Sequence, residues 1–280
     1  MSYKIIGDSC LDLTEELKKD SRFATVPLTL QVDDTMVIDD DTFDQKAFLD
    51  LVKASENCPK SACPSPDAFK QAMECDEDDV YIITLSSHLS GSYNSAVIGK
   101  ELYEEEHGAD HKNILVIDSE SASAGELNLA LGICEMYEEG LDFQAISEKI
   151  MKKRDDENIY FVLDTLDFLR KNGRLTGLQA FFATALNIKP IMGADKGVII
   201  KLDQARGINK AFARMCEFAV KEAGESEKKR VIIAHCNCPE RAAQVKQELE
   251  KRASFKEIVI TQAAGVATVY ANDGGIILAM

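Results

Sequence analysis

Short β-rich runs alternate with helical patterns through the first half of the chain, and this alternation limits the possible folds more than any other feature. Strand-like runs occupy residues 3–9, 80–85 and 113–119, and helical patterns follow the last two over residues 96–106 and 124–138. Strands separated by helices of this length favour right-handed βαβ units and a parallel sheet. We therefore predict an α/β protein whose residues 1–155 form an N-terminal parallel-sheet α/β/α domain.

The second half orders its elements differently. After a helical pattern at 142–156, residues 188–207 indicate a hairpin with a glycine-containing turn. Helical patterns at 209–223 and 239–252 then alternate with extended runs at 230–236, 257–263 and 274–280. This order predicts a smaller α/β domain with a mixed sheet over residues 156–280, and the charged stretch KKRDDEN is the expected boundary.

Charge and cysteine usage exclude several partners. The net charge is −16, so most of the surface repels nucleic acid and anionic bilayers. The eight cysteines follow no disulfide pattern, and the first residues lack the features of a signal peptide, so we expect a cytoplasmic protein. No apolar run reaches the length of a membrane span, and we expect no stable membrane insertion.

Polar loops follow three strands of the first half. These loops contain Asp8 and Ser9, then the serine-rich run 86–92, then residues 118–123. In open α/β sheets such loops share one crevice, where free N–H groups at helix starts favour an anion. The alternative is that these hydroxyls only cap helices and fill turns.

No motif predicts a cofactor or a metal. The glycine patterns of phosphate-binding and dinucleotide-binding loops are absent, so we expect no nucleotide cofactor. Cys236 and Cys238 have no second pair at zinc-like spacing. The acidic run 39–41 lacks the glycine and glutamate of a calcium loop, and it is more typical of a solvated hairpin or edge strand.

A serine esterase is an alternative, because GDS after the first strand resembles the nucleophile block of GDS-type esterases. Those enzymes pair their serine with an Asp-x-x-His block, and none of the four histidines here has an aspartate three residues before it. A serine without a positioned base is a poor nucleophile. The esterase interpretation with Ser9 as nucleophile is therefore the weaker one.

The segment RKNGRLTG is a cationic feature of an acidic chain. Arg174 offers a planar guanidinium suited to a carboxylate, and Thr176 is a candidate cap for a helix over the residues that follow. That helix would place Phe181, Phe182 and Leu186 as apolar surface beside Arg174. The alternative is that these residues are only the core face of the helix.

Together these motifs resemble the DegV family of bacterial fatty-acid-binding proteins. The segments that carry the resemblance are GDSCLDL, VPL, SACPSP, LSSHLSGSYNSA, VIDS, LDFLRKNGRLTG, LNIKPIM and ARGINKA. The resemblance implies the two-domain α/β fold above and a long-chain fatty acid as ligand, with its carboxylate between the domains and its tail in the second. A member presents the fatty acid to a separate fatty-acid kinase for phospholipid synthesis. Such a carrier is not itself an enzyme.

Residue by residue, the resemblance assigns the head group to Ser61, Ser90 and Arg174. Gly91 and Ser92, beside Ser90, and Ser9 in the first loop complete the expected set of ligand-binding residues.

The chain departs from the family pattern in two segments. Alanine and cysteine stand at two polar positions of the SACPS loop. Ala271 stands where many members carry a histidine, and the adjacent Tyr270 is a candidate replacement donor. The fold also resembles the substrate domain of dihydroxyacetone kinases, but those bind their ketone through a histidine, and none matches here.

Overall fold

The computed structural model describes residues 2–175 and 187–280. A four-stranded parallel sheet occupies the N-terminal half, in the order β2-β1-β6-β7. Its strands are β1 (Tyr3–Asp8), β2 (Phe23–Val26), β6 (Asp79–Thr84) and β7 (Asn113–Asp118). Its helices are α2 (Pro66–Ala72), α3 (Ser92–His107), α4 (Ala124–Glu138) and α5 (Phe143–Asp155). The predicted βαβ units and parallel sheet are confirmed.

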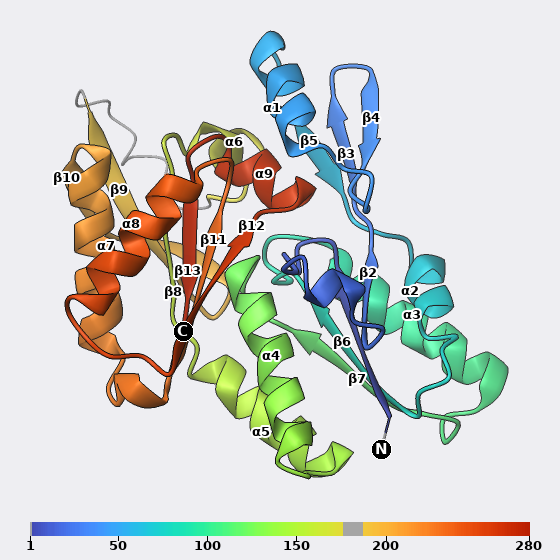
Figure 1. The fold of residues 1–280 in the computed structure, drawn as a ribbon. Coiled ribbons are helices and arrows are strands. Elements are labelled where there is room, and N and C mark those ends of the chain that lie inside the picture. The colour runs from blue at the N-terminus through green and yellow to red at the C-terminus, as the bar shows by residue number, and fades with distance from the viewer. Residues whose placement is uncertain (1, 176–186) are drawn as a thin grey trace.

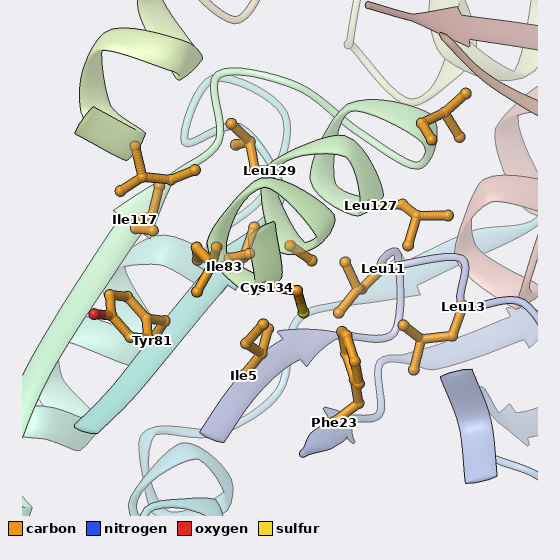
Figure 2. Packing of buried hydrophobic residues seen from close by; sticks show 14 of the residues in the cluster. Ile5, Leu11, Leu13, Phe23, Tyr81, Ile83, Ile117, Leu127, Leu129 and Cys134 are labelled. Carbon is orange, nitrogen blue, oxygen red and sulfur yellow. The ribbon is translucent and has the colours of Figure 1, made fainter. Parts of the chain in front are cut away.

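Side-chain alternation along β1 explains why helices cover both faces of this sheet. Successive strand residues point to opposite faces. Ile5 belongs to the same core cluster as Leu127 of α4, whereas Ile6 belongs to a separate core cluster with Phe69 of α2. Figure 2 shows Ile5 close to α4, with the neighbouring strands contributing further apolar side chains.

The C-terminal half builds a six-stranded mixed sheet in the order β10-β9-β8-β13-β11-β12, as predicted. Among the described strands of this sheet, only β11 and β12 pair in parallel. Its strands are β8 (Ile159–Val162), β9 (Ile188–Asp195), β10 (Val198–Arg206), β11 (Arg230–His235), β12 (Glu257–Gln262) and β13 (Ile276–Ala279). Helices α7 (Ile208–Glu222) and α8 (Pro239–Glu250) cover one face.

Both halves contribute to a third unit, which lies at one end of the molecule in Figure 1. It contains the antiparallel sheet β4-β3-β5 and helices from both halves. Its elements are β3 (Thr29–Val32), β4 (Thr35–Ile38), β5 (Lys60–Ala62), α1 (Gln45–Ala54), α6 (Asp167–Lys171) and α9 (Gly265–Ala271). The expected boundary between residues 155 and 156 falls between α5 and β8 and remains a prediction.

Two details complete the fold. Short 3-10 turns span Leu17–Lys19 and Ser226–Lys228. Within the described ranges, no helix combines the length and apolar character needed to span a membrane.

Candidate functional site

An apolar cavity of about 830 Å³, open mouth included, lies between the C-terminal sheet, α9 and the loops at the carboxyl ends of the N-terminal strands. Strands β8, β10 and β13 contribute Phe161, Ile199 and Ile277, and α9 contributes Val266 and Ala267. Aliphatic and aromatic walls of this kind suit an apolar ligand, because burying such surface is the main source of binding free energy.

Seven polar residues line the described wall of this cavity. Glu120, Ser121 and Ser123 come from the loop after β7, and four others come from distant parts of the sequence. Ser61 of β5, Ser90, Arg174 and Tyr270 of α9 all line it. The Ser61 Oγ lies 2.8 Å from the Tyr270 hydroxyl, and the Arg174 Cζ lies 5.6 Å from the centre of the Tyr270 ring. The described wall therefore combines an apolar body with several hydroxyl groups, one guanidinium and one carboxylate.

Backbone carbonyls hold Arg174 in place. Its Nε donates to the Leu89 carbonyl at 3.1 Å, and its Nη1 donates to the Asn172 carbonyl at 2.6 Å. No acceptor within the described residues occupies Nη2, so this nitrogen is available to an anion. The bond to Leu89 also ties Arg174 to the serine-rich loop that carries Ser90.

Ser90 and its neighbours mark the start of α3. The Ser92 amide donates to the Ser90 Oγ at 3.2 Å, and the two hydroxyls lie 3.1 Å apart. A Cβ built on Gly91 would lie 3.0 Å from the Cys63 Sγ, so glycine lets this loop pack closely against the SACPS loop. Of these three expected ligand residues, only Ser90 is among the described residues that line the cavity.

Ser9 has a different environment from Ser90. Its buried Oγ donates to Asp39 Oδ2 at 2.7 Å and accepts from the Leu28 amide at 3.1 Å. It is not one of the described cavity-lining residues, and the contacts given for its hydroxyl hold β1 to the segment around β3.

Asp39 holds the first turn of α9. Its Oδ1 accepts from the Gly265 amide at 2.6 Å, and its Oδ2 accepts from the Val266 amide at 2.7 Å. The expectation that residues 39–41 decorate a solvated hairpin is wrong for Asp39, which is 3% exposed. The reason is that the free N–H groups at a helix start need acceptors, and α9 has no side-chain cap of its own.

A second carboxylate supports the same helix. Asp12 Oδ1 accepts from the Ala264 amide at 2.6 Å, and Asp12 also accepts from the Ser123 hydroxyl. Burial raises the pKa of Asp12 to about 7 and the pKa values of Asp8 and Asp39 each to about 6. Through their bonds to the Ala264, Gly265 and Val266 amides, Asp12 and Asp39 position α9, and with it Tyr270.

Sequence reasoning missed Asp12 and Asp39 as support for the site, and it missed most of the cavity wall. The helix capped by Thr176 and the apolar residues Phe181, Phe182 and Leu186 lie outside the described residues. The buried run IYFV of β8 was a usable signal for the wall, because a fully apolar strand must be covered on both faces. Within the described ranges, no cluster of His, Cys, Asp and Glu has the geometry of a metal site.

Comparison with known proteins adds independent information. The sequence profile of the DegV family, described as uncharacterised proteins, matches residues 2–279. A DegV domain-containing protein of Streptococcus pyogenes is 35% identical over 99% of this chain and 99% of its own length. One of Streptococcus gordonii is 33% identical over 99% of this chain and 98% of its own length.

Solved structures agree with this match. A DegV family protein from Ruminococcus gnavus, described with vaccenic acid, is 45% identical, has a TM-score of 0.97 and aligns over all of both chains. The Fak B3 protein of the Streptococcus pneumoniae fatty acid kinase, loaded with linoleic acid, is 31% identical with a TM-score of 0.87, over 100% of this chain and 99% of its own.

Proposed function

This chain belongs to the DegV family, and from that premise we propose that it is a long-chain fatty-acid-binding protein that presents its ligand to a separate fatty-acid kinase. The observation that carries the proposal is the placement of Ser61, Ser90, Arg174 and Tyr270 together on the wall of one apolar cavity. A fatty acid has the matching chemistry, since it joins one anionic group to a long apolar tail.

The head group binds at the polar end of the cavity. A buried carboxylate without partners costs several kcal/mol, so a fatty-acid site requires donors at this end. Ser61 and Tyr270 share one hydrogen bond, which leaves one O–H of the pair free to donate. The Ser90 hydroxyl and Arg174 Nη2 are the further donors proposed for the head group. The expected roles of Gly91 and Ser92 are then to shape the Ser90 loop, and the expected role of Ser9 is to hold Asp39.

Burial of the tail supplies the affinity. A chain of roughly 16 carbons transfers about 15 methylenes from water, worth on the order of 12 kcal/mol before the costs of ordering are subtracted. Walls formed by Phe161, Ile199, Val266 and Ile277 offer the apolar surface for this transfer. The carboxylate contacts orient the ligand and keep its head beside Arg174 and Tyr270.

Two observations favour a carrier over an enzyme that acts on its own. The Ser9 Oγ donates to Asp39, so it has no histidine base of the kind an esterase needs. All four histidines lie in the described part of the chain, and none of them lines the cavity, which also disfavours a site like that of the dihydroxyacetone kinases. The fatty-acid kinase then supplies the phosphate, and its acyl phosphate serves phospholipid synthesis.

The carrier is proposed to work in the cytoplasm. All eight cysteines are unpaired thiols, five of them buried and three partly or fully exposed, as expected of a protein kept in a reducing compartment.

Native mass spectrometry of protein purified from bacteria tests the binding function. We expect a species a few hundred daltons heavier than the bare chain, which extraction with organic solvent removes and fatty-acid analysis identifies. Protein that stays ligand-free after incubation with hexadecanoic and octadecenoic acids would contradict the proposal.

A further inference from the structure

The small sheet β4-β3-β5 has one face toward the cavity and one face toward solvent. Val37, Leu30 and Ser61 stand opposite one another across its three strands, so they share a face. Leu30 is fully buried and Ser61 lines the cavity. Met36 pairs with Gln31 on the opposite face, which therefore points outward.

Two large apolar side chains are exposed on that outward face. Met36 is 59% exposed and Ile38 is 46% exposed, and they are the only large hydrophobic residues of the described part of the chain that are classed as exposed. They stand two positions apart on β4, which pairs with β3 alone among the described strands. Figure 1 shows β4 at the outer side of this unit. β4 thus offers an apolar pair and an unpaired strand edge together, and both favour protein partners.

Exposed aspartates surround this strand. Asp33 and Asp34 form the turn before β4, and Asp40 and Asp41 follow it. If a second copy of the chain paired antiparallel along β4, the aspartates of one copy would lie next to those of the other. This contact between like charges is unfavourable. The same charges repel an anionic bilayer. The charges therefore favour a protein partner with an apolar centre and a basic rim.

We propose that the exposed edge and outward face of β4, centred on Met36 and Ile38, is the docking surface for the fatty-acid kinase. This proposal rests on the proposed carrier function. β3 is the only strand between β4 and β5, so docking here places the kinase about two strand spacings, or about 10 Å, from Ser61. An enzyme that transfers phosphate to the bound carboxylate must reach this end of the cavity, and a phosphate-handling enzyme commonly carries the basic residues that the aspartates would attract.

Two double variants test the surface. In Met36→Ser/Ile38→Ser the apolar pair is removed, and in Asp34→Lys/Asp41→Lys the rim charge is reversed; neither pair lines the cavity. Asp76→Lys/Glu105→Lys is the charge-matched control, since both residues are exposed and lie away from β4. The measurements are the fatty-acid affinity of each protein and its use by the purified fatty-acid kinase of the same bacterium, followed as acyl phosphate formation.

We expect each β4 variant to raise the carrier concentration for half-maximal kinase rate at least tenfold, while its fatty-acid affinity stays within twofold of wild type. The control variant should match wild type in both assays. Kinase rates that are unchanged in both β4 variants would overturn the docking surface and leave the carrier function standing. Loaded wild-type protein that the kinase does not use would instead overturn the carrier function itself, and the docking proposal with it.

Discussion

The hydroxyl oxygens of Ser61 and Tyr270 lie 2.8 Å apart, although the two residues are 209 positions apart in the sequence. Ser61 comes from β5 of the small antiparallel sheet and Tyr270 from α9 near the end of the chain. One hydroxyl donates to the other, which leaves one O–H of the pair free to donate to a carboxylate beside it, so the pair marks the proposed position of a fatty-acid head group. The family histidine is absent at Ala271, and Tyr270 provides a donor that needs no protonation to act.

Replacement of Tyr270 by phenylalanine should weaken binding of a fatty acid while leaving the ring against Arg174. Loss of one hydrogen bond to a charged group costs about 1.5–3 kcal/mol, which corresponds to a dissociation constant about 10- to 100-fold higher. Titration with a fluorescent fatty acid measures the change. A fatty alcohol of the same length should lose much less, and equal losses for both ligands would show that Tyr270 does not contact the carboxylate.

Arg174→Ala should weaken fatty-acid binding by a similar factor, because it removes the cation nearest the proposed head group. The matched control is Arg170→Ala, which deletes an exposed arginine of α6 that pairs only with Asp167 in the described structure. Thermal denaturation checks that both variants fold. Equal affinities in the two variants would argue against Arg174 as a ligand.

Asp39→Ala should reduce both stability and binding, since it leaves the Gly265 and Val266 amides without their acceptor. Unpaired buried groups cost about 1–3 kcal/mol each, so the free energy of unfolding should fall by about 3 kcal/mol. Urea denaturation measures this loss. The carboxylate of the neighbouring Asp40 is exposed and, among the described residues, accepts only from Thr42, so Asp40→Ala should stay near wild type.

The pH dependence of stability should report the buried aspartates. Burial raises the pKa of Asp12 from 3.8 to about 7, and the pKa values of Asp8 and Asp39 to about 6. These groups hold protons more tightly in the folded than in the unfolded chain, so their contribution to the free energy of unfolding falls as pH rises from about 4 to about 7. Asp12→Asn removes the part of this pH-dependent decrease in the free energy of unfolding that comes from Asp12.

Urea denaturation at several pH values between 4.5 and 7.5 compares Asp12→Asn with wild type. The amide changes the free energy of unfolding by an amount that does not depend on pH. On top of this constant difference, we expect the free energy of unfolding of the variant to rise relative to that of wild type as the pH increases. The exposed Asp41→Asn serves as the control for loss of a surface carboxylate. A parallel profile for Asp12→Asn would contradict a raised pKa of Asp12.

Chain-length preference should depend on Ala194 of β9. Ala194 and Ile159 line the cavity near the start of β8, whereas the other end of β8 leads through α6 to Arg174. Ala194→Phe should therefore weaken binding of an octadecanoic acid more than that of a dodecanoic acid, because the shorter tail ends before the filled volume. Competition titration with both acids gives the ratio of their dissociation constants. An unchanged ratio would place the tail elsewhere.

Strand and helix periodicity predicted both main sheets, because that periodicity is local. The family resemblance named Ser61, Ser90 and Arg174, which line one cavity, and also Ser9, Gly91 and Ser92, which are not among its described lining residues. The role of these residues in binding stays a prediction.

The sequence pattern did not predict α9. Val266, Thr268 and Val269 are β-branched and weak helix formers, and Asp39 and Asp12, which accept its first N–H groups, are more than 200 residues away. Long-range capping of this kind leaves no local pattern.

The most direct test of the account is a crystal structure of the chain with bound hexadecanoic acid. We predict a carboxylate within about 3 Å of donors on Ser61, Ser90, Tyr270 or Arg174, with the tail running along Phe161 and Ile277. A carboxylate bound away from all four residues, or a fatty acid found only outside the cavity, would contradict it.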